Sequence, residues 1–136
     1  MLDSPFSQYR NILVSENYSA AKALQDFALS CYNGNMAQFR GDALRNFDAN
    51  HMAIFLELAR HYHEHGENDP CLLEVGATIW ENRRRAGRKV LDDLAALKAI
   101  APADFQDGTE KDYWDEVRWL EKTASDLKKQ GWIPQA

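Results

Sequence analysis

The sequence has few of the residues that favour β-sheets and tight turns. Val, Ile and Thr together number 12 of the 136 residues, and Gly and Pro together number 11, whereas Ala and Leu number 32. Good helix formers therefore outnumber good strand formers, and residues that interrupt a helix are scarce. This composition disfavours a β-sandwich, a β-barrel and a large α/β sheet, and it predicts an all-α protein. The hydrophobic share of 45% is ordinary for a globular domain and too high for a disordered chain.

Other features that the sequence lacks indicate in which compartment we expect the protein and which partners are unfavourable. No run reaches the roughly 18 apolar residues of a membrane span, and the first five residues lack the basic and apolar regions of a signal peptide. Two cysteines, Cys31 and Cys71, are too few for a disulfide scaffold. We therefore expect a cytoplasmic protein with reduced thiols. The formal net charge of −5 makes nucleic acid and anionic membrane surfaces unfavourable partners.

Start and stop signals predict a single domain over residues 1–136. Ser, Asp or Thr residues that can cap a helix precede the apolar stretches, and Gly or Pro residues follow most of them. The predicted helices cover roughly 5–14, 19–32, 48–65, 70–99 and 109–130, with Ser19 as the cap of the second, and 42–47 adds one or two helical turns. Short loops favour antiparallel neighbours. We therefore expect a four- to five-helix bundle, mostly antiparallel, with one core.

The apolar positions of the longer helices recur at helical spacing. In the 48–65 helix they spread over roughly 200° of the helical wheel, which predicts a central place in the bundle. The other two long helices have narrower seams, formed by Leu72, Val75, Ile79, Ala86, Val90, Leu94 and Leu97 in one and by Tyr113, Val117, Leu120, Ala124 and Leu127 in the other.

Three of the four histidines lie together in residues 61–65. His61 and His65 are one helical turn apart and Glu57 lies one turn before His61, so these three could offer ligands to one metal ion. Neither the Glu-x-x-His pattern of di-iron bundles at these histidines nor the His-Glu-x-x-His pattern of zinc proteases is present. The alternative is a helix end rich in histidine, where a charged imidazole interacts favourably with the helix dipole. We expect no cofactor, and the metal site stands as a second hypothesis.

Residues 83–89 hold five of the sixteen cations. Three of the five have an acid one helical turn away, which indicates a solvated face with internal ion pairs rather than a nucleic-acid site. Arg83 differs because it lies within the apolar seam, where an aliphatic residue is expected. It either forms an internal pair with an acid or extends past the core edge into solvent. Alternatively, it marks a polar pocket or subunit contact, to which the small residues Gly76, Ala86 and Gly87 would give access.

Two tryptophans, Trp114 and Trp119, flank the apolar seam of the last helix on either side. Within a bundle such rings are usually packed from several directions. An exposed Trp119 beside Glu116 and Arg118 would instead suit a protein interface. We therefore treat Arg83, Trp114 and Trp119 as the candidate partner-binding residues.

Catalytic motifs are missing. The sequence has no Gly-rich phosphate loop, no Gly-x-Ser-x-Gly and no Cys-x-x-Cys. Cys71 follows a proline in the first turn of a helix, where the dipole could activate a thiol, but a structural cysteine is the simpler interpretation. Nothing in the sequence argues for an enzyme.

Together these features predict a small, acidic, cytoplasmic helical protein that acts without catalysis by binding another macromolecule or itself. Adaptors, chaperones and proteins that neutralise a toxin or effector are of this type, by analogy of fold class. The net charge of −5 and an aromatic surface would suit a basic partner. The alternative is a bundle that holds a metal or a small polar ligand, either through Glu57, His61 and His65 or around Arg83.

Overall fold

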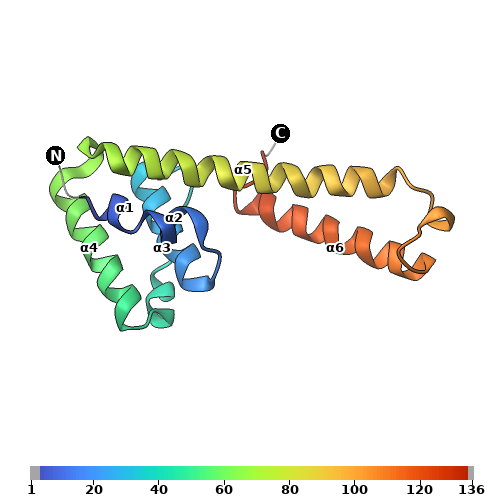
Figure 1. Cartoon of the computed structure of the whole chain (residues 1–136), viewed down its shortest axis with the longest axis horizontal. Coiled ribbons are helices and arrows are strands. Elements are labelled where there is room, and N and C mark those ends of the chain that lie inside the picture. The colour runs from blue at the N-terminus through green and yellow to red at the C-terminus, as the bar shows by residue number, and fades with distance from the viewer. Residues whose placement is uncertain (1–3, 135–136) are drawn as a thin grey trace. The chain divides into compact units, whose positions relative to one another are not determined.

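A computed structural model of the chain describes residues 4–134, and all regular secondary structure among them is helical. This confirms the all-α prediction. None of the described helices has both the length and the apolar character needed to cross a membrane. The elements in chain order are α1 (Pro5–Gln8), α2 (Arg10–Ser15), α3 (Ser19–Tyr32), η1 (Gly41–Asn46), α4 (Ala49–His65), η2 (Gly66–Asn68), α5 (Pro70–Lys98), η3 (Pro102–Asp104) and α6 (Glu110–Lys129), where η marks a 3-10 helix (Figure 1).

Side-chain caps explain where several helices begin. The Ser4 hydroxyl accepts a hydrogen bond from the Phe6 N–H and Asp48 accepts one from the His51 N–H, as expected for N-cap residues. Thr109 starts α6 with a reciprocal capping box. The cap predicted at Ser19 is wrong, because α3 begins at Ser19 itself and its N-cap residue makes no side-chain bond. The predicted 5–14 helix is divided into α1 and α2.

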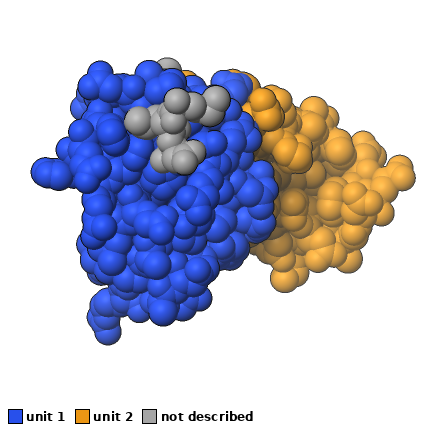
Figure 2. Space-filling model, turned by 60° about the vertical axis from the view of Figure 1, so that its left-hand side comes forward, with its two compact units in different colours: residues 1–82 blue, residues 83–136 orange. Residues whose placement is uncertain are grey.

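The chain separates into two compact units, residues 1–82 (unit 1) and 83–136 (unit 2), which are coloured separately in Figure 2. Helix α5 contributes its first part to unit 1 and its second part to unit 2. Each unit has its own cluster of buried apolar side chains. The single-domain organisation and the bundle arrangement stay predictions, and the two units are described separately below.

Unit 1 packs α1 to α4 and the first part of α5 around one cluster. Helix α4 is less buried than predicted for a central helix. Only Ile54 and Leu58 of this helix are buried, and Leu56 is 50% exposed. Helix α3 supplies more of the core than α4 does. The buried apolar side chains are Phe6, Leu13, Leu24, Ala28, Leu29, Cys31, Ile54, Leu58, Leu72, Val75 and Ile79.

In unit 2, α6 runs antiparallel to the second part of α5 (Figure 1). The predicted seams meet there: Leu97 packs with Tyr113, Val117 and Leu120, and the Tyr113 hydroxyl donates a 3.3 Å hydrogen bond to the Leu97 carbonyl oxygen. A two-helix hairpin covers only one side of each helix. Among the described residues of unit 2, four large hydrophobic side chains are exposed: Leu91, Ile100, Trp114 and Trp119.

Two glycines of α5 lie where another segment comes close. A Cβ atom at Gly76 would lie 2.2 Å from the Tyr32 ring, and one at Gly87 would lie 2.4 Å from the Trp132 carbonyl oxygen. The small residues noted in the sequence thus allow close packing within each unit. At Gly87 the neighbour is the backbone of the C-terminal segment, which brings Ile133 into a buried position.

Candidate functional site

The histidine cluster is organised around a buried carboxylate. Asp69 has no exposed surface, and its Oδ1 accepts a 2.8 Å hydrogen bond from the Cys71 N–H. Its Oδ2 accepts bonds from the Ser4 hydroxyl at 2.5 Å and from His61 Nε2 at 2.8 Å. Asp69 therefore begins α5 as a helix cap and also connects α5 to the residue preceding α1 and to the end of α4.

Burial and hydrogen bonding in this cluster shift the pKa of two groups, the Asp69 carboxyl and the Cys71 thiol. Burial by itself raises the pKa of the Asp69 carboxyl, but the hydrogen bonds from Ser4, the Cys71 N–H and His61 outweigh burial and bring the pKa below its ordinary value. The pKa of the Cys71 thiol is raised, because the thiol is desolvated and lies near the Asp69 charge. An activated thiol at this helix start is thus not supported, and the cluster has the features of a structural anchor.

The structure does not bring Glu57, His61 and His65 together as metal ligands. Glu57 Oε2 accepts a 2.6 Å hydrogen bond from the Tyr9 hydroxyl, while His61 is bonded to Asp69. The His61 and His65 ring centroids are 4.5 Å apart. Within residues 4–134, no three His, Cys, Asp or Glu side chains are grouped so that they could hold a metal ion.

Arg83 is buried, with 5% of its surface exposed, so the side chain does not extend into solvent. Its guanidinium carbon lies 5.0 Å from the centre of the Trp132 ring, within the range of a cation–π contact. Trp132 belongs to the C-terminal segment that packs at Gly87. Arg83 therefore contributes to the packing of unit 2. The neighbouring Lys89 forms the expected ion pair with Asp93 at 2.8 Å.

The two tryptophans of α6 have different surroundings. Trp119 is 59% exposed, more than any other large hydrophobic residue among those described. Trp114 is 44% exposed, and its ring packs edge-on against Tyr113 with centroids 5.0 Å apart. Exposing an indole ring to this degree has a free-energy cost in water, which contact with another apolar surface would reduce.

Trp119 lies on the wall of a groove of about 680 Å³ in unit 2, called here the acidic groove. The end of α5 forms one wall, the first turns of α6 form the other, and η3 with the residues after it closes one end. Leu97 and Leu120 form a buried apolar floor, and Ile100 is 41% exposed. The lining residues are Asp93, Ala96, Leu97, Ile100, Asp104, Phe105, Gln106, Asp107, Asp112, Glu116, Trp119 and Leu120.

Charges in unit 2 are strongly segregated around this groove. Residues 83–136 contain eleven Lys and Arg residues and ten Asp and Glu residues, so the unit is almost neutral. Five of the ten acids line the groove, and none of the eleven cations does. Like charges gathered in a concave surface repel one another and produce a focused negative potential. The folded chain thus maintains an arrangement of like charges that is electrostatically unfavourable.

The acids of the groove are not equally available. Asp93 pairs with Lys89, and Asp112 accepts the Thr109 N–H in the capping box. The pKa of Asp112 is lowered mainly by that bond, so the carboxylate stays charged at neutral pH. The other three, Asp104, Asp107 and Glu116, form no ion pair with any residue in the described part of the chain. These three carboxylates can therefore interact with a partner.

Sequence reasoning identified Trp119 but not the groove around it. The five acids come from α5, η3, α6 and the loop between η3 and α6, and no spacing rule connects Asp93 with Asp107 or Glu116. His61 was considered as a metal ligand, but its contact with Asp69 depends on how the fold places the end of α4 beside the start of α5. A cap residue followed by proline and preceded by a histidine eight residues earlier is too general a pattern to predict it.

Comparison of the chain with protein-family models, with curated proteins and with solved structures finds no significant match to any of the three.

Proposed function

We propose that the chain is a non-catalytic helical binding protein that captures a positively charged segment of a protein partner in the acidic groove. The observation that carries this proposal is the gathering of five acids and no cation around an exposed Trp119. Arg83, which is buried, and Trp114, which does not line the groove, have no direct part in it.

The physical basis is a combination of two interactions. Asp104, Asp107 and Glu116 attract Lys or Arg side chains over long range and accelerate the encounter. Trp119 then stacks on an aliphatic or guanidinium group, and the apolar floor accepts an aliphatic or aromatic side chain. Charge provides the selection and the indole provides most of the affinity. The best ligand is therefore a segment that carries cations next to an apolar residue.

Selection of random peptides displayed on phage against the immobilised chain tests this proposal. We expect enriched peptides to contain at least two Lys or Arg residues close to an aromatic or aliphatic residue, and their binding to weaken as salt increases. Trp119→Ala should weaken a selected peptide by about 30-fold, which is the effect of a central interface residue. Asp107→Asn with Glu116→Gln should weaken it several-fold and reduce the salt dependence.

Matched variants outside the groove serve as controls. Trp114→Ala removes an exposed indole from the same helix, and Glu110→Gln with Asp126→Asn removes two exposed charges from it. Both should leave peptide affinity unchanged. Enriched peptides without cations, or equal losses in the groove and control variants, would contradict the proposal. Self-association abolished by Trp119→Ala would replace the separate partner with a second copy of the chain.

A further inference from the structure

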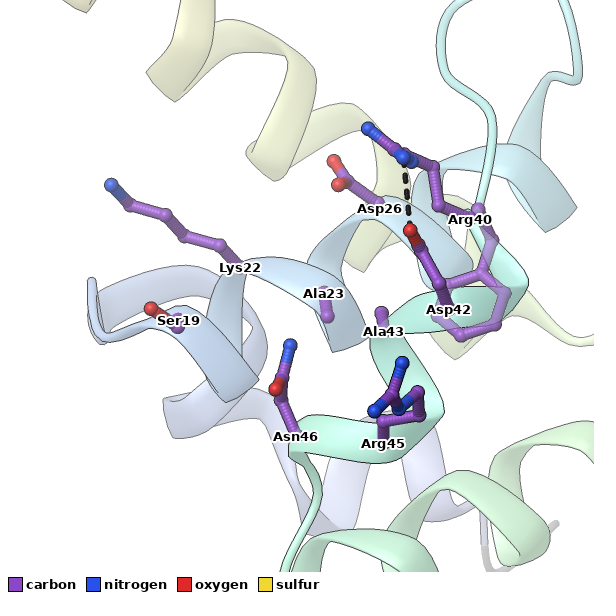
Figure 3. Close-up of a pocket in the computed structure, with 10 residues that line it drawn as sticks. Ser19, Lys22, Ala23, Asp26, Arg40, Asp42, Ala43, Arg45 and Asn46 are labelled. Carbon is purple, nitrogen blue, oxygen red and sulfur yellow. Dashed lines mark hydrogen bonds and ion pairs between the residues drawn. The ribbon is translucent and has the colours of Figure 1, made fainter.

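Unit 1 contains a second concave surface with the opposite charge, called here the cationic hollow. It has a volume of about 630 Å³ and lies between the first two turns of α3 and the 3-10 helix η1. Figure 3 shows Lys22 on α3, and Arg45 and Asn46 on η1, around this hollow. Its volume lies within the range of small-molecule sites, which is roughly 300–1,000 Å³.

The cations of unit 1 are concentrated at this one place. Residues 1–82 contain only five Lys and Arg residues against eleven Asp and Glu residues. Three of those five, Lys22, Arg40 and Arg45, line the hollow. In a strongly acidic unit, charges distributed for solubility alone would not leave most of the cations around one concavity. This concentration is the observation on which the inference rests.

Internal pairing accounts for only part of that charge. Arg40 forms a 2.9 Å ion pair with Asp42, seen as the dashed contact in Figure 3. Asp26, the other acid of the hollow, takes part in an interaction of its own. Lys22 and Arg45 form no ion pair with any residue in the described ranges. Lys22 also lies near the start of α3, where the helix dipole disfavours a cation.

The wall of the hollow also includes an aromatic side chain that packs against other aromatic rings. Phe39 lines the hollow and packs against Phe27 and Phe55, with ring centroids 5.6 Å and 5.2 Å away. Such an aromatic cluster holds its members in position. Ser19 and Asn46 add a hydroxyl and an amide to the lining. The surface thus combines two available cations, neutral hydrogen-bonding groups and one aromatic face.

We propose that the cationic hollow, which Lys22 and Arg45 line, binds a small organic oxyanion, a phosphate monoester or a carboxylate. Arg45 offers a planar fork of donors that matches either group, and Ser19 and Asn46 add neutral hydrogen bonds. A polyanion such as nucleic acid is disfavoured, because the six excess negative charges of residues 1–82 repel it over long range. This proposal is independent of the acidic groove.

Titration of the ¹⁵N-labelled chain with phenyl phosphate, followed by amide chemical shifts, tests the proposal. We expect saturable shifts confined to residues 19–26 and 39–46. Lys22→Gln with Arg45→Gln should weaken binding by at least about tenfold, as expected when two charge-assisted hydrogen bonds are lost. Arg60→Gln, which removes another exposed cation of unit 1, should change nothing. Circular dichroism checks that both variants remain folded.

A parallel titration with citrate distinguishes the two classes of oxyanion, since the one that saturates at lower concentration identifies the preferred group. Sodium chloride at matched ionic strength measures non-specific screening. Shifts that do not saturate, that sodium chloride reproduces, or that persist unchanged in the double variant would each overturn the proposal.

Discussion

Replacing Asp69 with alanine is expected to destabilise unit 1 strongly, because one buried carboxylate serves three donors. The substitution removes the cap of α5 and the acceptor of the Ser4 hydroxyl and of His61 Nε2. Ser4 is itself buried, so water does not readily replace the lost acceptor. The N-cap contributes about 1 kcal/mol, and each buried donor left without a partner costs about 1–3 kcal/mol. Allowing for partial relaxation, we expect a loss of about 3 kcal/mol.

Urea unfolding at pH 7, followed by circular dichroism, measures this loss as a change in the free energy of unfolding. Asp48→Ala is the matched control, because Asp48 also caps a helix and also contacts a histidine, but its side chain is exposed. We expect Asp48→Ala to cost less than half as much as Asp69→Ala. Equal losses in the two variants would contradict this prediction, since burial of the Asp69 network would then add nothing to the effect of a simple cap.

Three other predictions follow from the structure. The pKa of Asp69 is lowered in the folded state. Its stabilising effect is therefore complete above about pH 4 and is lost as the pH falls through the folded-state pKa. Asp69→Asn should therefore make the free energy of unfolding less dependent on pH on the acid side. Gly87→Ala should destabilise unit 2 by about 1–3 kcal/mol in thermal unfolding, because the new Cβ meets backbone atoms, whereas Gly41→Ala, with open space around its Cβ, should be nearly neutral. Burial raises the pKa of Cys31 to about 12, so iodoacetamide should label Cys31 much more slowly than the half-buried Cys71 in the native protein, and comparable rates would contradict the described burial.

Local signals in the sequence predicted the helices well because helix ends depend on a few neighbouring residues. The caps at Ser4, Asp48 and Thr109 act on backbone N–H groups two or three positions away. A short spacing of this kind can be recognised without knowledge of the fold. The error at Ser19 has the same origin, since a serine before an apolar stretch is an equally good first helical residue. Local sequence does not distinguish an N-cap serine from a serine at the first position of a helix.

The apolar seams of α5 and α6 were also evident in the sequence, but their partners were not. The α5 seam was expected to face one core, whereas its first part packs in the cluster of unit 1 and Leu97 packs in that of unit 2. Periodicity shows which face of a helix is apolar and not what covers it. For the same reason the wide apolar arc of α4 suggested a central helix, although Leu56 is half exposed.

The all-α class, the main helix boundaries and the residues with unusual chemistry (Arg83, Trp119 and the histidines) could all be predicted from the amino-acid sequence. The contacts of those residues, in contrast, follow from the folded structure. It paired His61 with a buried Asp69 and placed Arg83 on Trp132. It also brought acids from α5, η3, α6 and the loop between η3 and α6 to the groove that Trp119 lines. Caps and periodicity act over a few residues along the chain, whereas a site is formed by side chains that folding brings together from distant positions, where no local pattern relates them.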